Sequence, residues 1–370
     1  MRRILVWWLP FLLALCARAQ QPLDLNRLKM PGGFHITVFA GVYSPRMMVF
    51  SPGGVLLASD TDSGKVVALP DPKHTGKAER VVVVLDNLRQ PHGLAFYQGK
   101  LYVAETDRVR SYDWDEQTLR ASNPKQLVEL PTGGHATRTL LFHNGKMYVS
   151  VGSSCNACIE KDPRRAAVLE FNPDGSGQRI FAKGVRNAVG LAVSPKTNTV
   201  RVTENGRDWM GDDLPPEGIY DLGADGGDFG WPYCYGDRVP DPNFTNAGDN
   251  RCQSVVRPKV QMQAHSAPLG LAFYEGTMFP PEYRNNIFVA FHGSWNRSVP
   301  TGYKVVRVKL DDIGQPLGGA GDFITGWLAP GEKKKGRWMG RPVGIVFGSD
   351  GSMYLSDDAG GFIYRITYAK

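Results

Sequence analysis

The stretch Gly93-Leu94-Ala95-Phe96, followed after four residues by Leu101-Tyr102-Val103, decides the fold of this chain. It consists of a short apolar strand, a turn and a second short strand, and the pattern occurs six times. One such hairpin cannot bury its apolar face alone, so the copies must pack on one another. The other copies are Met47-Met48-Val49-Phe50 with Val55-Leu56-Leu57-Ala58, Thr139-Leu140-Leu141-Phe142 with Met147-Tyr148-Val149, Gly190-Leu191-Ala192-Val193 with Val200-Arg201-Val202, Gly270-Leu271-Ala272-Phe273 with Ile287-Phe288-Val289, and Gly344-Ile345-Val346-Phe347 with Met353-Tyr354-Leu355.

The spacing of the copies predicts how they are arranged. Counting from Met47, their starts lie 46, 46, 51, 80 and 74 residues apart. Because a closed ring of such units has no long open edge, the repeat predicts an all-β, six-bladed β-propeller. The longer intervals predict extra loops at 203–264 and 311–340, gathered on the face that carries the chemistry.

The first residues have the features of a cleavable signal peptide. Arg2 and Arg3 precede an apolar run that ends at Leu15, and Ala17-Arg18-Ala19 is a small-x-small cleavage site. The apolar run is too short to span a bilayer. The sequence therefore predicts a signal peptide at 1–19 and a single propeller domain at 20–370. It also predicts a periplasmic or secreted location, with no integral membrane segment after the leader is removed.

The charge balance gives no sign of a nucleic-acid partner. Loss of Arg2, Arg3 and Arg18 with the leader lowers the formal net charge from +7 to +4. This surplus is mild, and the run Lys333-Lys334-Lys335 is typical of a solvated loop. We therefore expect no binding to DNA or RNA.

Four cysteines remain after the leader, and an even count in an exported protein favours disulfides. Three pairings are possible, and we favour the two that each lie within one loop. A redox or zinc role is weaker, because no βαβ context and no second Cys-x-x-Cys are present. The favoured pairs are Cys155–Cys158 and Cys234–Cys252.

Candidate catalytic residues precede the first strand of several copies. His135 comes before the third copy, Arg186-Asn187 before the fourth and Arg341 before the sixth. In a propeller these strand ends meet at the central axis, so we expect the residues to line one funnel. Histidine is a natural general base near neutral pH, and arginine binds carboxylates or a developing oxyanion. No nicotinamide or flavin fingerprint and no Gly-x-Ser-x-Gly elbow is present.

The loop from Glu204 to Glu217 is rich in oxygen donors. Carboxylates and carbonyl groups in a loop kinked by glycine suit a hard cation, above all calcium. The alternative is an ordinary polar surface loop, and the spacing is not that of an EF-hand.

At these positions the chain resembles the glucose/sorbosone dehydrogenase family. Its members are exported six-bladed propellers that use pyrroloquinoline quinone (PQQ) and calcium. The likeness covers about residues 28–367 and is strongest to the L-sorbosone and pyranose dehydrogenase branch. The matching motifs are Pro31-Gly32-Gly33-Phe34, Gly134-His135, Val151-Gly152-Ser153-Ser154-Cys155-Asn156, Arg164-Arg165-Ala166-Ala167, Gly184-Val185-Arg186-Asn187, Glu204-Asn205-Gly206-Arg207-Asp208, Gly227-Asp228-Phe229-Gly230-Trp231-Pro232, His265-Ser266-Ala267-Pro268 and Gly340-Arg341-Pro342.

The resemblance implies roles around the quinone. His135 matches the base that takes the proton of the anomeric hydroxyl while hydride passes to PQQ. Arg186 matches the arginine that stabilises charge on the quinone oxygen, with Asn187 beside it. Arg341 matches an arginine that pairs with a PQQ carboxylate.

The resemblance also implies the metal ligands. Gly206 and Arg207 match backbone carbonyls on the calcium ion that bridges to PQQ. Asp208, Asp213 and Glu217 are candidates for further ligation.

The chain departs from the soluble glucose enzymes at three positions. Their lysine on the quinone falls near Asn296-Arg297, so Arg297 or the nearby Lys304 is the candidate for that role. Met339 stands where they have a second arginine, and Arg207 where they have proline.

The leading hypothesis is a PQQ- and calcium-dependent dehydrogenase that oxidises an aldose or sugar aldehyde. Its electrons would pass to a separate acceptor, a quinone or a cytochrome, because the sequence shows no fused cytochrome segment. One alternative is a calcium-dependent propeller hydrolase of the lactonase type, which leaves the arginines without an anionic cofactor. Another is a non-catalytic propeller that binds carbohydrate or a protein.

Overall fold

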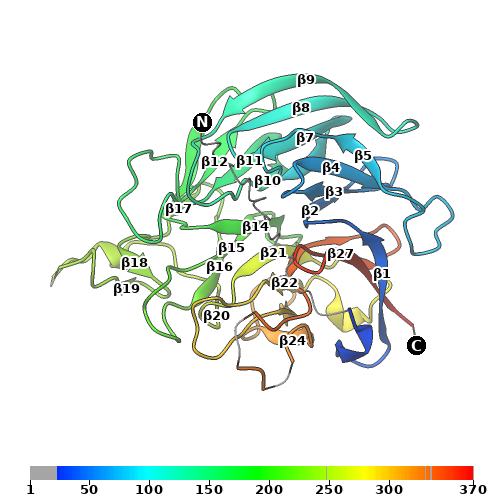
Figure 1. Ribbon diagram of the computed structural model, residues 1–370. Coiled ribbons are helices and arrows are strands. Elements are labelled where there is room, and N and C mark those ends of the chain that lie inside the picture. Colours follow the sequence, from blue (N-terminus) through cyan, green and yellow to red (C-terminus); the bar gives the residue numbers. More distant parts are fainter. Residues whose placement is uncertain (1–22, 247, 330, 334–335, 370) are drawn as a thin grey trace, which may run out of the picture.

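The protein is a ring of six β-sheets around a central axis (Figure 1). The computed structural model describes residues 23–246, 248–329, 331–333 and 336–369. The predicted signal peptide at 1–19 lies outside the described residues. The predicted all-β six-bladed propeller is confirmed, and the helices in the described part are three 3₁₀ turns of three residues each.

Each blade is an antiparallel sheet whose strands follow one another from the axis outward. The first three blades follow the chain in order. Blade 1 is β2 (Pro45–Phe50), β3 (Leu56–Asp60), β4 (Lys65–Leu69) and β5 (Val82–Leu85); blade 2 is β6 (Leu94–Tyr97), β7 (Lys100–Glu105), β8 (Arg108–Asp115) and β9 (Arg120–Glu129); and blade 3 is β10 (Leu140–His143), β11 (Lys146–Val151), β12 (Ala167–Phe171) and β13 (Arg179–Lys183).

Blades 4 and 5 carry the long insertions, and blade 6 joins the two ends of the chain. The 3₁₀ turns are η1 (Leu25–Arg27), η2 (Arg251–Gln253) and η3 (Pro281–Tyr283). Blade 4 is β14 (Ala188–Val193), β15 (Val200–Glu204), β16 (Glu217–Asp221) and β20 (Val260–Met262); blade 5 is β21 (Pro268–Phe273), β22 (Ile287–Phe291), β23 (Lys304–Val308) and β24 (Gly321–Ile324); and blade 6 is β25 (Pro342–Phe347), β26 (Met353–Asp357), β27 (Phe362–Tyr368) and β1 (Phe34–Gly41).

Three short strands of the insertion in blade 4 lie outside this order. β17 (Gly227–Asp228) pairs in parallel with β13 and so extends blade 3. β18 (Cys234–Tyr235) and β19 (Val239–Pro240) form a small hairpin of their own, which projects from the ring in Figure 1.

The glycines that begin four of the copies let neighbouring inner strands touch. A Cβ at each of them would lie within 2.4 Å of a carbonyl oxygen of the next inner strand, so no side chain fits there. These close approaches join the inner strands around the axis. The pairs are Gly93 with Arg138, Gly190 with Leu269, Gly270 with Val343, and Gly344 with Arg46.

Threonine hydroxyl groups also join neighbouring blades by hydrogen bonds, close to the glycine contacts described above. Thr139 of blade 3 donates to the Val189 carbonyl of blade 4 (2.6 Å), and Thr203 of blade 4 donates to the Leu269 carbonyl of blade 5 (2.7 Å). Buried hydroxyls with a carbonyl partner satisfy backbone groups that would otherwise be unpaired. The inner strands therefore start at one common end of the ring, and this positions the side chains that precede them.

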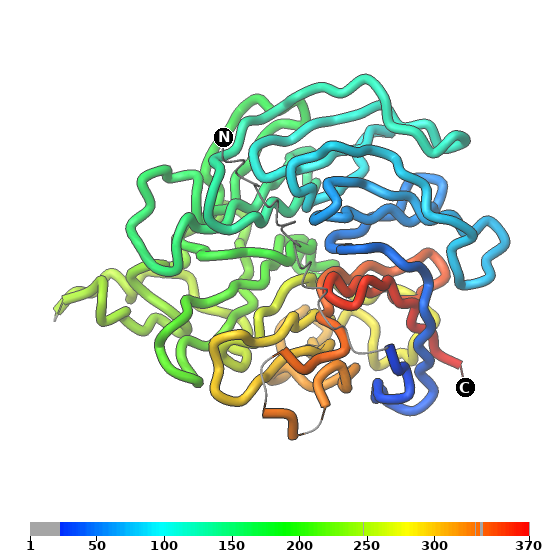
Figure 2. Tube along the Cα trace, viewed as in Figure 1, coloured from blue at the N-terminus to red at the C-terminus, as the bar shows by residue number. Residues whose placement is uncertain are grey.

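The N-terminal strand completes the last blade. β1 pairs with β27 from Phe34 with Tyr368 to Gly41 with Phe362, and the register shifts once between Val38 and Ala40. Figure 2 shows this contact as the blue strand beside the red one. Among the described residues, no helix has the length and apolarity needed to cross a membrane.

Candidate active site

His135 lies in the segment that leads into β10, and tight backbone packing holds it there. Its N–H donates to the Ser153 carbonyl at 3.0 Å. Gly134 has a φ of +64°, and a Cβ on it would lie 2.4 Å from the same carbonyl oxygen. A Cβ on Gly152 would lie 2.5 Å from the Cβ of His135. The glycines on either side thus allow His135 to reach the site.

Ser153 fixes the orientation of the imidazole. Nδ1 of His135 lies 3.0 Å from both the carbonyl and the hydroxyl oxygen of Ser153. A carbonyl oxygen only accepts, so Nδ1 carries the proton and Nε2 keeps its lone pair. Burial and then the charge of Arg186 lower the pKa of His135 to about 4. The ring is therefore a neutral acceptor near pH 7, as a general base requires.

Arg186 is buried at 4% exposure and joins three segments. Nε donates to the Asn156 carbonyl at 2.8 Å, and Nη1 donates to the Gly206 carbonyl at 2.9 Å. Nη2 donates to Oδ1 of Asn156 at 3.0 Å and to the carboxylate of Asp208 at 3.3 Å. A charged donor with this many acceptors is rigidly placed. Asn187, next in sequence, is buried, and its Oδ1 has no partner.

The loop between β15 and β16 presents backbone carbonyls and buried carboxyl groups. The Gly206 N–H donates to Oε2 of Glu217 at 2.7 Å, and the Gly206 carbonyl faces Arg186. Burial raises the pKa of Glu217 to about 8 and that of Glu204 to about 7. A nearby cation or further hydrogen-bond donors would stabilise the charged form of these buried carboxyl groups.

The remaining candidate ligands of this loop differ in their surroundings. Arg207 forms a buried ion pair with Asp241 at 2.9 Å, which anchors its backbone. Burial raises the pKa of Asp208, and the positive charge of Arg186 partly offsets this increase. Asp213 is 85% exposed and pairs with Arg297 at 3.0 Å, so it lies at the outer edge of the loop.

Arg341 directly precedes β25 of blade 6. It lies at the same end of the ring as His135 and Arg186, which precede the inner strands of blades 3 and 4. Its Nε donates to the His292 carbonyl at 3.0 Å and Nη2 to the Gly293 carbonyl at 2.7 Å. Its guanidinium also lies 5.6 Å from the ring centre of Tyr303 and 5.8 Å from that of Trp338. Burial lowers the pKa of Arg341.

Asn296 and Arg297 join the network of Arg186, whereas Lys304 does not. Nδ2 of Asn296 donates to Asp208 at 2.9 Å, and Arg297 donates to the Asp212 carbonyl. The expectation that Lys304 reaches the site is corrected. Lys304 begins the third strand of blade 5, and its ammonium pairs at 2.5 Å with Asp322 on the outer strand β24.

Two groups of the site were missed in the sequence. Asn156 holds both Arg186 and Asp208, and the Cys-x-x-Cys motif around it was the available signal. His292 lies with Nε2 at 2.8 Å from Asp358, which also pairs with Arg46 at 2.5 Å. Burial and then the charge of Arg341 lower the pKa of His292 to about 4.

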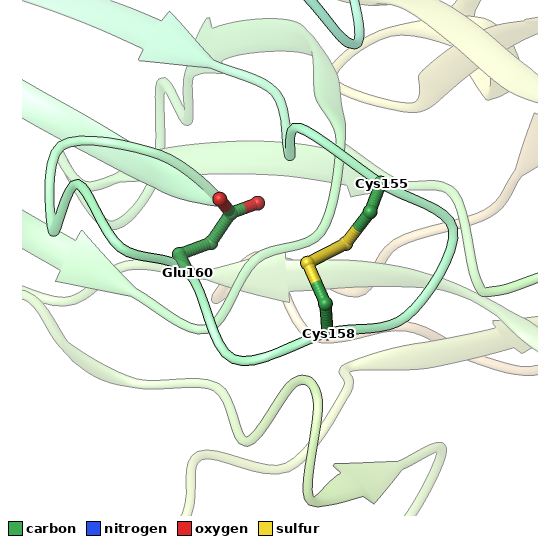
Figure 3. A group of neighbouring side chains, drawn as sticks. All are labelled: Cys155, Cys158 and Glu160. Atoms are coloured by element: carbon green, nitrogen blue, oxygen red, sulfur yellow. A yellow bond between two sulfur atoms is a disulfide. The ribbon is translucent and has the colours of Figure 1, made fainter.

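Both predicted disulfides, Cys155–Cys158 and Cys234–Cys252, are confirmed. Figure 3 shows Cys155–Cys158 with Glu160 nearby. Within the described part of the chain, this is the only group of three Cys, His, Asp or Glu ligand atoms that lie within 4.8 Å of one another. Its sulfurs are bonded to each other and Glu160 accepts from Ser154, so it is not a ready metal site.

Comparisons with known proteins agree with this geometry. A family model described as TrAA12-like matches residues 28–369. An uncharacterized protein of Borreliella burgdorferi is 31% identical over 93% of this chain and 92% of its own length. A pyrroloquinoline quinone-dependent pyranose dehydrogenase of Coprinopsis cinerea is 26% identical over 95% of this chain, which spans 56% of that enzyme's length.

Solved structures share the fold. An iodide structure of the Trichoderma reesei carbohydrate-active enzyme family AA12 has a TM-score of 0.81 at 25% identity, over 92% of this chain and 98% of that chain. The holo PQQ domain of the Coprinopsis cinerea pyranose dehydrogenase has a TM-score of 0.78 at 23% identity, over 94% and 98%.

Proposed function

The chain belongs to the TrAA12-like family, and on this premise we propose that it is a PQQ-dependent sugar dehydrogenase. The finer parts of the proposal are that it requires calcium, works in the periplasm or outside the cell, and oxidises an aldose or a sugar aldehyde. Its electrons pass to a separate acceptor. The two disulfides support an oxidising compartment.

One observation supports the chemistry more than any other. His135 has a free lone pair on Nε2 while Ser153 holds Nδ1–H, and burial together with the charge of Arg186 lowers the pKa of the imidazole. A neutral imidazole placed in this way accepts the proton of a sugar hydroxyl as the C–H bond on the same carbon breaks. The bound quinone supplies the hydride acceptor.

The residues fit a polar, anionic cofactor. Three buried polar atoms around the site have no partner: Oδ1 of Asn187, Oδ1 of Asn296 and Nε of Arg297. Orphaned buried atoms of this kind need an explanation, and a polar ligand is one. The guanidinium groups of Arg186, Arg297 and Arg341 would hold the carboxylates and quinone oxygens of PQQ.

The loop from 204 to 217 fits a calcium ion. It offers the carbonyl groups of Gly206 and Arg207, with the carboxylate of Asp208 nearby and that of Glu217 bonded to the Gly206 N–H. Such oxygen donors are the ligands that calcium prefers. Asp213 would contribute only if its exposed side chain turned inward.

A calcium-dependent hydrolase is the second candidate, because of His292 and Asp358. A histidine held by a carboxylate at 2.8 Å can activate water without any quinone. This candidate predicts lactone hydrolysis by the cofactor-free protein and loss of it in His292→Gln. It leaves the three arginines unexplained.

The absorbance spectrum of the purified protein tests the leading proposal. We expect PQQ to bind in the presence of calcium and its spectrum to change to the reduced form when an aldose is added. An artificial electron acceptor should then restore the oxidised spectrum. A spectrum that no sugar changes, in a protein that binds PQQ, would contradict the proposal.

Calcium removal is the first specific prediction. Because the ion would neutralise buried carboxyl groups, EDTA should lower the melting temperature and abolish PQQ binding, and added calcium should restore both. Thermal melting and PQQ titration measure the two effects. If EDTA changes neither, the loop from 204 to 217 holds no metal.

A further inference from the structure

Two exposed tryptophans from different blades meet beside the candidate site. Trp209 lies in the loop after β15 of blade 4 and is 68% exposed, and Trp295 lies in the loop after β22 of blade 5 and is 54% exposed. Their ring centres are 5.0 Å apart and their planes are at 85°. Large aromatic groups left in water at one place usually mark a binding site.

Four polar contacts hold the two loops together, and we call them the interloop clasp. They are the hydrogen bonds or ion pairs Asp208–Asn296 at 2.9 Å, Asp212–Ser298 at 2.9 Å and Asp213–Arg297 at 3.0 Å, and the hydrogen bond from Arg297 to the Asp212 carbonyl. The clasp holds the first loop on both sides of Trp209 and the second loop directly after Trp295. The aromatic pair is therefore set in place before any ligand arrives.

The backbone at Trp209 supports a functional reason for its position. Its φ is +69°, in the left-handed region that bulky residues rarely adopt. Such a conformation persists where surrounding contacts enforce it, and it is frequent at ligand sites. Here the neighbouring Asp208 is bonded to both Arg186 and Asn296.

The tryptophans border the chemistry directly. Asp208, one residue before Trp209, contacts Arg186 at 3.3 Å, and Asn296, one residue after Trp295, contacts Asp208. The inner end of the clasp is thus part of the candidate site, and the indole rings lie one residue away from it.

We propose that Trp209 and Trp295 form a subsite that stacks against the pyranose ring next to the sugar unit being oxidised. The proposal rests on the proposed function. In an all-equatorial pyranose such as glucose, the ring faces carry C–H groups with partial positive charge, and an aromatic face is negative. Two perpendicular indole rings offer a face and a wall to such a ring.

The surrounding groups suit a sugar rather than a flat protein surface. Asp212, Asp213 and Arg297 belong to the same two loops as the tryptophans, and their polar groups can bond to sugar hydroxyls. Leu214 and Val299, which are 44% and 51% exposed, belong to the same two loops. The alternative is that a protein electron acceptor docks on this patch, and the experiment below distinguishes it from a sugar subsite.

The test uses cellotetraose and D-glucose as probes, with Trp209→Ala, Trp295→Ala and the corresponding Phe variants. Calorimetric titration of the protein loaded with calcium and already reduced PQQ measures sugar binding without turnover, and steady-state rates give KM and kcat. We expect each Ala variant to raise Kd and KM for cellotetraose about 10-fold, with smaller effects on D-glucose and kcat. The Phe variants should recover most of the affinity.

Controls keep this result separate from the proposed function. Ile313 is as exposed as Trp209, and its turn lies beside Lys196, which is at the end of blade 4 far from the site. Ile313→Ala should therefore leave Kd, KM and kcat for both sugars unchanged. Open-chain sorbitol should bind no better to the wild type than to the Ala variants. If cellotetraose binds through the tryptophans but no sugar is oxidised, the subsite stands and the dehydrogenase proposal fails.

Three results would overturn the subsite. The first is an unchanged Kd for cellotetraose in both Ala variants. The second is a Kd for sorbitol that equals the Kd for cellotetraose and rises by the same factor in the Ala variants. The third is an unchanged sugar Kd together with slower reduction of cytochrome c, which would make the patch a docking surface for an electron acceptor.

Discussion

His135 is the residue on which the proposed reaction depends. His135→Gln keeps a polar side chain of similar size but removes the group that accepts the proton. We expect turnover to fall by about 10²–10⁴-fold, while PQQ and calcium bind nearly as well as in the wild type. Stopped-flow reduction of the bound cofactor and PQQ titration measure the two effects.

A matched control and a pH titration make this prediction specific. His143 is at the far end of β10 and also bonds one backbone carbonyl, at 2.9 Å from Asn198, so His143→Gln should keep full activity. Burial lowers the pKa of His135, so its NMR signal in the cofactor-free protein should titrate near pH 4 and the base form should prevail above that pH. Wild-type turnover in His135→Gln would show that another group is the base.

Arg341 should act on binding rather than on the proton transfer. Its guanidinium is held by the carbonyls of His292 and Gly293, so its charge is fixed near the axis. Arg341→Ala should weaken PQQ binding at least 10-fold, as expected for the loss of one charge-assisted contact, with kcat at saturating PQQ much less affected. Arg307→Ala, which removes a guanidinium that lies over Tyr283 on the same propeller, is the control. Equal PQQ affinity in Arg341→Ala and Arg307→Ala would remove Arg341 from the cofactor site.

At the scale of elements, the two disulfides have different effects: one positions side chains of the site, and the other stabilises a loop insertion. Asn156 lies inside the Cys155–Cys158 loop and bonds Arg186, and the Cys155 carbonyl accepts from Ser153, which orients His135. The Cys234–Cys252 bridge is buried in the blade 4 insertion, where it packs with Val255. The first bridge therefore positions side chains of the candidate site, and the second stabilises the insertion.

Removal of each disulfide should separate these effects. Cys155→Ala/Cys158→Ala should reduce turnover about 10-fold and change the melting temperature little, because its loop spans three residues. Cys234→Ala/Cys252→Ala should lose about 3 kcal/mol of stability, since the bridge closes a loop of 18 residues, with little change in turnover. Activity assays and chemical denaturation measure the two changes. The reverse pattern would contradict the assignment.

Some elements could be predicted from the sequence and others could not. The inner hairpins have apolar side chains at fixed spacing, so their pattern was visible, for example at β6 and β7. The outer strand β9 is mostly exposed and lacks such a pattern. The short strand β17 depends on its pairing with β13, which lies far away in the sequence, and the hairpin of β18 and β19 has only two residues in each strand.

The same limit applies to the site. His135, Arg186 and Asn187 were predictable because they precede inner strands, whose starts meet at one end of the ring. The role of Asn156 depends on partners 30 and 52 residues away, and the Cys-x-x-Cys motif around it is the only local signal. The direction of the Lys304 side chain depends on the position of its strand within blade 5, which the sequence pattern did not fix.

At the scale of the whole molecule, the ring is closed in blade 6, where the two ends of the chain share one sheet. β1 adds the fourth strand to blade 6, and seven residue pairs join it to β27. Phe34, its first residue, packs against four rings of blades 5 and 6, with centres 4.8–5.1 Å away. The N-terminal strand therefore links the last two blades as well as closing the ring.

Phe34→Ala tests this closure. Loss of a buried phenyl ring that contacts Phe279, Tyr283 and Phe323 should cost about 3–5 kcal/mol. For a domain of this size that cost corresponds to a melting temperature lower by roughly 4–7 °C. His35→Ala alters the next residue of the same strand, which is exposed, and should shift the melting temperature by less than about 1 °C. Differential scanning calorimetry compares the two variants, and equal small shifts would show that the ring is held closed without Phe34.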